Sequence, residues 1–129
     1  MMADVKTIMT ADPSGAELVS LAEATADRLV RDGLSRSKIR DIFTEVRRIE
    51  ALWEVTPEIA LRRLNMLKPK LDYSVARDRT VQELARVLSQ AIDQVQAAGS
   101  PAEREQRIRR FMDFFEAILA YHRAKGGKN

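Results

Sequence analysis

The stretch that most constrains the fold is residues 101–125, which has the pattern of one long amphipathic helix. Ser100 is a favourable N-cap, Pro101 suits the first helical position, and Glu103 completes a capping box. Gly126-Gly127 marks the end of the helix. Apolar and aromatic residues, with one histidine, recur at steps of three and four and so share one face; they are Ile108, Phe111, Phe115, Ile118, Leu119 and His122. Other helices must bury a face of this kind.

Four further segments carry similar apolar stripes and are bounded by helix signals such as Ser35, Thr56-Pro57 and Gly33. In the segment of residues 57–67, Ile59 and Leu64 are expected to face the core. Together with residues 101–125 they predict an all-α chain, a single compact bundle of about five helices with short loops, in one domain over residues 1–129. The four segments are residues 16–31, 35–53, 57–67 and a stretch from Tyr73 or Thr80 to Ala98.

Three parts of the chain are expected to fall outside regular helix. Residues 1–15 mix turn-forming residues without a period and are predicted to form a flexible leader. Residues 126–129 are predicted to be a frayed tail. In the segment LKPKLDY, Pro69 removes a backbone donor and disfavours helical geometry at Lys68, so a kink or break is expected there.

Composition narrows the class of protein. Apolar residues make up 45% and charged residues 32% of the chain, which is typical of a globular domain. Neither a membrane-spanning apolar run nor a signal peptide is present, and we expect a cytoplasmic protein without a membrane partner. With no cysteine, the chain forms no disulfide and no thiolate metal site. A net charge of +3 permits a polyanionic partner without requiring one.

The sequence does not favour an enzyme. His122 is the single histidine, and its place on an apolar face indicates a packed or capping residue. No nucleophile stands beside a base and an orienting group, and no glycine-rich phosphate loop is present. We therefore predict no catalytic residues, no metal site and no cofactor. The acidic residues mostly lie three or four positions from a basic residue, as on a solvated helix face.

The basic residues are more informative. Arg36, Arg40 and Arg47 fall within about 40° of one another on the second helical segment. An aligned row of this kind can follow a phosphate backbone, although it can equally be an ordinary solvated rim. In LKPKLDY, a stiff turn would hold Lys68 and Lys70 in place with little loss of entropy on binding.

These segments also carry a family resemblance. The stretches GLSRSKIRDIFTEVRRI, LKPKLDYSVAR and FMDFFEAILAYHRAKGG stand in the order and spacing of the small Csm protein, the small subunit of type III-A CRISPR effector complexes. The resemblance implies a non-catalytic helical bundle. It also implies that several copies stack into a minor filament beside other CRISPR effector subunits. There they would contact the backbone of target RNA paired to guide RNA.

The resemblance also implies which side chains contact RNA. Mapped by position, the basic and polar pattern of the family falls on six residues: three in the second helical segment, two in LKPKLDY and one shortly after it. Two carboxylates, Asp41 and Asp72, depart from the family pattern beside these cations. The six residues are Lys38, Arg40, Arg47, Lys68, Lys70 and Arg77.

A second class of function fits the same sequence. A helical adaptor or oligomeric scaffold that binds no nucleic acid would share the all-α pattern and the absence of catalytic groups. The placement of the cations in three dimensions separates the two. Convergence of Arg40, Arg47, Lys68, Lys70 and Arg77 on one face favours RNA binding, and scatter favours the adaptor.

Overall fold

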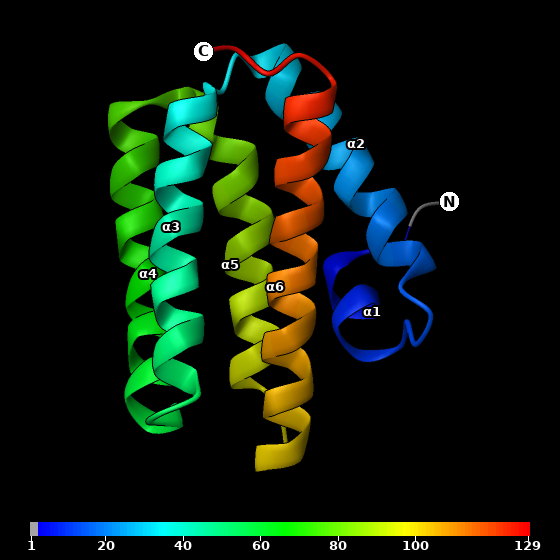
Figure 1. Cartoon of the computed structure of the whole chain (residues 1–129), viewed down its shortest axis with the longest axis vertical. Coiled ribbons are helices and arrows are strands. Elements are labelled where there is room, and N and C mark those ends of the chain that lie inside the picture. The colour runs from blue at the N-terminus through cyan, green and yellow to red at the C-terminus, as the bar shows by residue number, and fades with distance from the viewer. Residues whose placement is uncertain (1–2) are drawn as a thin grey trace.

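The computed structural model describes residues 3–129, and over that range the chain is all-α, as predicted. Roughly parallel helices form the main bundle, a tilted helix crosses beside it, and a short helix lies below that one (Figure 1). The C-terminus lies at the same end of the bundle as the start of α3. The elements are α1 Val5–Thr10, α2 Ala16–Asp32, α3 Arg36–Trp53, α4 Pro57–Arg77, the 3-10 turn η1 Arg79–Val81, α5 Gln82–Gln96 and α6 Pro101–Ala124.

Side-chain caps fix the ends of the two helices whose starts were clearest in the sequence. The Ser35 hydroxyl accepts from the Lys38 amide at 3.2 Å, and the Ser100 hydroxyl accepts from the Glu103 amide at 3.2 Å. The Glu103 carboxylate returns to accept from the Gly99 amide at 3.1 Å, so the capping box closes one residue before the cap itself. Both predicted starts are therefore confirmed.

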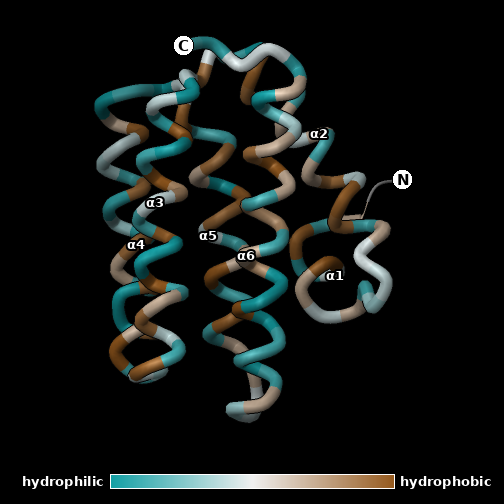
Figure 2. The backbone as a smooth tube through the Cα atoms, viewed as in Figure 1, coloured by the Kyte–Doolittle hydropathy of each residue, from teal (hydrophilic) through white to brown (hydrophobic). Residues whose placement is uncertain are grey.

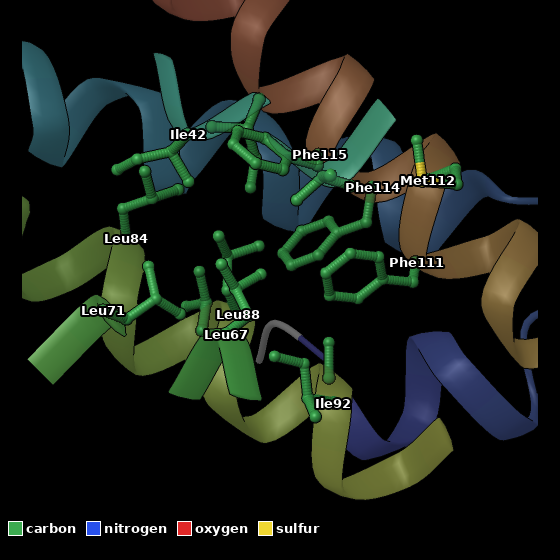
Figure 3. Packing of buried hydrophobic residues seen from close by; sticks show 14 of the residues in the cluster. Ile42, Leu67, Leu71, Leu84, Leu88, Ile92, Phe111, Met112, Phe114 and Phe115 are labelled. Atoms are coloured by element: carbon green, nitrogen blue, oxygen red, sulfur yellow. The ribbon is translucent and has the colours of Figure 1, made fainter. Parts of the chain in front are cut away.

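The core is centred on α6, which packs against α1, α2, α3 and α5. Phe111, Phe114 and Phe115 are fully buried, and the rings meet side chains from the facing helices (Figure 3). Phe43 of α3 lies edge-on to Phe115, with ring centroids 5.1 Å apart. The inward face predicted for residues 101–125 is confirmed, and Phe114 adds a fully buried ring that the predicted stripe did not include.

The prediction of a flexible leader is wrong for the described part of residues 1–15. Helix α1 buries Val5, Ile8 and Met9, which stand at helical spacing and pack against α5 and α6. Arg110 of α6 donates to the Met9 carbonyl at 2.8 Å. A six-residue helix is unstable alone, so this segment depends on tertiary burial that a local pattern does not reveal. Residues 1–2 lie outside the described range.

The predicted break at Pro69 is also wrong, because α4 runs unbroken from Pro57 to Arg77. Proline in a helix interior costs about 3 kcal/mol. Here its ring lies on the exposed side, while Leu67 and Leu71 on either side of it are buried against the neighbouring helices. Burial of two leucines contributes roughly 1.5–3 kcal/mol each, which offsets that cost. Of the two starts proposed for the next segment, Tyr73 is wrong because it lies inside α4, and Thr80 is nearer because it lies in η1, just before α5 begins at Gln82.

Hydrogen bonds hold the C-terminal tail, residues 126–129, against the bundle, so the prediction of a frayed tail is wrong. The Arg36 amide donates to the Lys128 carbonyl at 2.5 Å, and the Gly127 amide donates to the His122 carbonyl at 2.9 Å. The His122 ring is fully buried, and its Nε2 donates to the Leu34 carbonyl at 2.8 Å. The predicted structural role of this histidine agrees with these contacts.

Hydrophobic and hydrophilic residues alternate along each helix (Figure 2), and most of the large hydrophobic side chains are buried between the helices. Helix α4 is an exception. Ile59, which was expected to face the core, is 49% exposed, so that assignment is wrong. It lies about 100° around the helix from Ala60, the residue that is buried at this level.

Candidate nucleic-acid interface

All six residues proposed to contact RNA lie on one pair of neighbouring helices. Helix α3 carries three of them and α4 the other three, and a short connection joins the two helices (Figure 1). The pair packs together along one edge of the bundle. The fold therefore brings the two sequence segments side by side, although it does not place all six side chains in one line.

On α3, the cations occupy opposite flanks. Lys38 lines a groove against α4 together with Asp41 and Glu45. Arg40 and Arg47 are about 160° and 180° away from Lys38 around the helix axis. Arg47 lies over the ring of Phe43, 5.8 Å from its centroid, and that ring contacts Phe115 of α6. The two arginines therefore border α6, and both are exposed.

On α4, the two lysines beside Pro69 point away from each other. Lys68 faces α5, where its ammonium contacts the Asp93 carboxylate at 2.5 Å. Lys70 faces α3 and lies 3.6 Å from the Glu45 carboxylate. A separation of two residues is about 160° in a helix, whereas a turn could have aligned them. The continuous helix is thus the reason that the predicted single strip does not form.

Carboxylates balance the groove between α3 and α4. This groove has a volume of about 180 Å³, and its charged lining consists of two lysines and two acids, Lys38 and Lys70 against Asp41 and Glu45. A phosphate entering it would meet no net positive charge. On the flank of α3 that borders α6, acids balance the arginines only in part. Arg47 pairs with Glu50 at 3.3 Å, whereas Arg40 is exposed to solvent.

The outer face of α4 carries a pattern that sequence reasoning missed. Ile59, Met66 and Tyr73 stand seven residues apart and are 49%, 54% and 64% exposed. Three cations also stand seven apart, and the six positions lie within about 80° around the axis, although the ammonium of Lys70 reaches back towards Glu45 of α3. The signal was present in the sequence as two interleaved seven-residue spacings. The assumed break at Pro69 concealed it. The cations are Arg63, Lys70 and Arg77.

Tyr73 and Arg77 already interact on this face. The Arg77 guanidinium donates to the Tyr73 hydroxyl at 3.0 Å and lies 5.7 Å from the ring centroid. The pair presents a flat aromatic and cationic surface near the C-terminal end of α4. Beyond it, Asp78 accepts from the Thr80 hydroxyl and amide, and these hydrogen bonds hold the pKa of its carboxyl below the usual range.

The described residues contain no metal-binding cluster and no membrane-spanning helix. Across residues 3–129, no three His, Cys, Asp or Glu side chains gather in a way that could hold a metal ion. Within the same range, no helix is long and apolar enough to cross a membrane. The buried His122 ring points at a backbone carbonyl and not into a cleft.

Comparison with known families places the chain in one of them. The family model described as Csm2 Type III-A matches residues 12–128, which is nearly the whole chain. The matched region contains α2 to α6, including both helices of the candidate interface. No curated protein and no solved structure matches the chain.

Proposed function

The chain belongs to the Csm2 type III-A family and is a small Csm subunit of a type III-A CRISPR complex, and from this premise we propose that it is a structural subunit that binds RNA. In this proposal it has no catalytic role of its own. Several copies line up as a minor filament, and each contacts the backbone of target RNA while the target is paired to guide RNA.

The observation that carries the proposal is the exposed arginine flank of α3. Arg40 and Arg47 are held about two turns apart on a helix whose inner face is buried in the core. Their separation along the axis is about 10.5 Å, from seven residues at 1.5 Å each. Guanidinium groups on a rigid helix suit phosphate oxygens, because the fork geometry is fixed before binding.

The proposed contact reads shape and phosphate, and not base sequence. Guide–target pairing already identifies the sequence, and a paired strand presents its backbone and 2′-hydroxyls outward. One copy offers only a few cations and would bind weakly. Several copies along one strand gain from effective concentration, so the modest net charge of +3 is compatible with tight binding by the assembly.

The test is RNA binding by the reconstituted complex over a salt series. Arg40→Ala combined with Arg47→Ala is expected to lower the slope of log affinity against log salt by about 0.7 per lost contact. Matched and mismatched targets should weaken alike. The control is Arg109→Ala combined with Arg123→Ala, which removes two exposed arginines from α6. Unchanged affinity and slope in an intact complex would refute the RNA contact of the α3 flank.

A second candidate function, the helical adaptor, is favoured by the scatter of the basic residues and by the outer face of α4. Large exposed apolar side chains at seven-residue spacing are typical of a helix that packs against another protein. By this alternative the chain is a helical adaptor or scaffold, and Ile59, Met66 and Tyr73 contact a neighbouring subunit or copy. Met66→Ser with Tyr73→Ser should then prevent assembly. Retained assembly with weakened RNA binding would favour the first proposal.

A further inference from the structure

A second groove lies away from the α3–α4 pair, between α2, η1 and α5. Its volume is about 670 Å³, and its lining contains four arginines from three elements. Arg28 and Arg31 come from α2, Arg79 from η1 and Arg86 from α5. These arginines are far apart in the sequence and meet only through the fold. We refer to this site as the arginine groove.

One carboxylate, that of Glu83, contacts two of the four arginines in the arginine groove. The Glu83 side chain is only 12% exposed and contacts Arg28 at 3.1 Å. It also accepts from the Arg86 Nε at 3.0 Å with both oxygens. Hydrogen bonding from Arg86 lowers the pKa of Glu83, so the group stays ionised. Arg28 and Arg86 are thereby held at one end while more than half of the Arg28 side chain and half of the Arg86 side chain remain exposed.

The other two arginines are not held by acids. Arg31 and Arg79 are exposed on α2 and η1, and neither makes an ion pair with any residue from 3 to 129. The lining acids are Asp32 and Glu83, so four arginines against two carboxylates leave an excess of positive charge. This differs from the α3–α4 groove, where the lining charges cancel.

The arginine groove continues along the bundle. A second depression of about 610 Å³ between α4 and α5 shares Arg79, Gln82 and Arg86 with it. It adds the polar residues Asp72, Ser89 and Gln90 and the apolar residues Val75, Ala76 and Ala85. Gln82 and Gln90 are separated by about 12 Å along α5. The combined surface is therefore elongated, and it suits an extended chain better than a single small anion.

We propose that the arginine groove binds the phosphodiester backbone of single-stranded RNA, as a contact additional to the α3 flank. The inference rests on the proposed function for the identity of the ligand. All eight residues that line the groove are charged or polar, so it offers no apolar anchor of the kind that protein interfaces use. Arginine forks bind phosphates, and amide and hydroxyl groups such as those of Gln82 and Thr80 complete phosphate and sugar contacts.

The experiment is a titration of the full chain with a short oligouridylate, followed by amide chemical shifts in NMR spectra at low and moderate salt. We expect the amides of Arg31, Thr80 and Gln82 to shift together, with an affinity that falls as salt rises. Arg31→Gln with Arg79→Gln should weaken this binding about tenfold, the equivalent of one charge-assisted hydrogen bond. Arg109→Gln with Arg123→Gln is the matched control and should have little effect.

Each other outcome overturns the inference. Shifts confined to α3 and α4 would be compatible with the proposed function but would show that the arginine groove does not bind RNA. Absence of any shift at the highest oligouridylate concentration would show that the groove binds no RNA, while the salt series on the assembled complex still decides the proposed function. Equal shifts with a polyglutamate peptide would assign the groove to an acidic protein segment. Arg31→Lys with Arg79→Lys checks folding, because it keeps the charge and should retain part of the binding.

Discussion

Helices α6 and α4 are of similar length but place their large side chains in opposite ways. In α6, Phe111, Phe114 and Phe115 are fully buried. In α4, Ile59, Met66 and Tyr73 face solvent while a narrower leucine stripe faces the bundle. The difference indicates that α6 is used to hold the fold together, whereas the outer face of α4 is free for a partner. The following predictions test that division.

The largest effect is expected in α6. Phe115→Ala removes a fully buried ring and its edge-on contact with Phe43, and should lower the free energy of unfolding by about 3–5 kcal/mol. That is a large share of the stability of an ordinary domain. Chemical denaturation monitored by circular dichroism measures it. A curve that overlays wild type would mean that the inward face of α6 is assigned wrongly.

A smaller loss is expected where α6 meets the C-terminal tail. His122→Gln should cost about 1–3 kcal/mol, because it disturbs a buried hydrogen bond to the Leu34 carbonyl. Gly127→Ala should cost a similar amount, since an added methyl group would overlap the His122 ring. Thermal melts of both variants check this, with Gly99→Ala as control at an exposed glycine whose added methyl group would be in ordinary contact distance. If Gly127→Ala were as stable as wild type, the C-terminal tail would not be packed closely against the His122 ring.

The ion pairs at the end of α6 predict a pH dependence. Lys125 contacts Asp27 at 3.1 Å and Glu23 at 3.2 Å on α2, and these acids raise its pKa. A raised folded-state pKa means that the stabilisation is complete below the unfolded value of about 10.4 and is lost as pH rises through the folded value. The melting temperature of wild type should therefore approach that of Lys125→Gln between neutral and strongly alkaline pH. A constant difference across that range would exclude the ion pairs as the cause.

The smallest effect on folding is expected at the outer face of α4. Met66→Ser with Tyr73→Ser should change the free energy of unfolding by only about 0.5 kcal/mol or less per site, as for other exposed positions. The same variant is the test of subunit contact described above. A loss comparable to Phe115→Ala would mean that the face is buried in the free chain, and the contrast between the two helices would fail.

Much of the fold followed from local signals in the sequence. The caps at Ser35 and Ser100 and the apolar stripe of residues 101–125 are local, and each was placed correctly. Helix α1 and the continuity of α4 through Pro69 depend on burial against distant helices, which no local pattern contains. Both predictions were wrong because they relied on local propensity, whereas tertiary packing determines the structure of these two segments.

The sequence indicated which segments carry the candidate site, but not how their side chains are arranged in space. The sequence identified the segments that carry the six cations, yet it put Lys68 and Lys70 together on a turn at Pro69, whereas the continuous helix α4 separates them. Their contacts with RNA remain a prediction. The arginine groove brings Arg28 and Arg31 to Arg79 and Arg86 across about fifty residues of chain, so only the fold could identify it.

Contact of target RNA with the arginine flank of α3 can be tested by cysteine labelling, with the outer face of α4 as a second reporter for contact with a neighbouring subunit. The chain has no cysteine, so single introduced thiols report one position each. Thr44→Cys lies near the Arg40 and Arg47 row, Met66→Cys lies on α4, and Ala120→Cys is an exposed control on α6.

Maleimide labelling would be compared in the free subunit, in the assembled complex and in the complex with target RNA. We predict that Met66→Cys is protected by assembly alone, that Thr44→Cys is protected only when target RNA is added, and that Ala120→Cys does not respond to RNA. Equal labelling of Thr44→Cys with and without bound target RNA would show that RNA does not cover the arginine flank of α3.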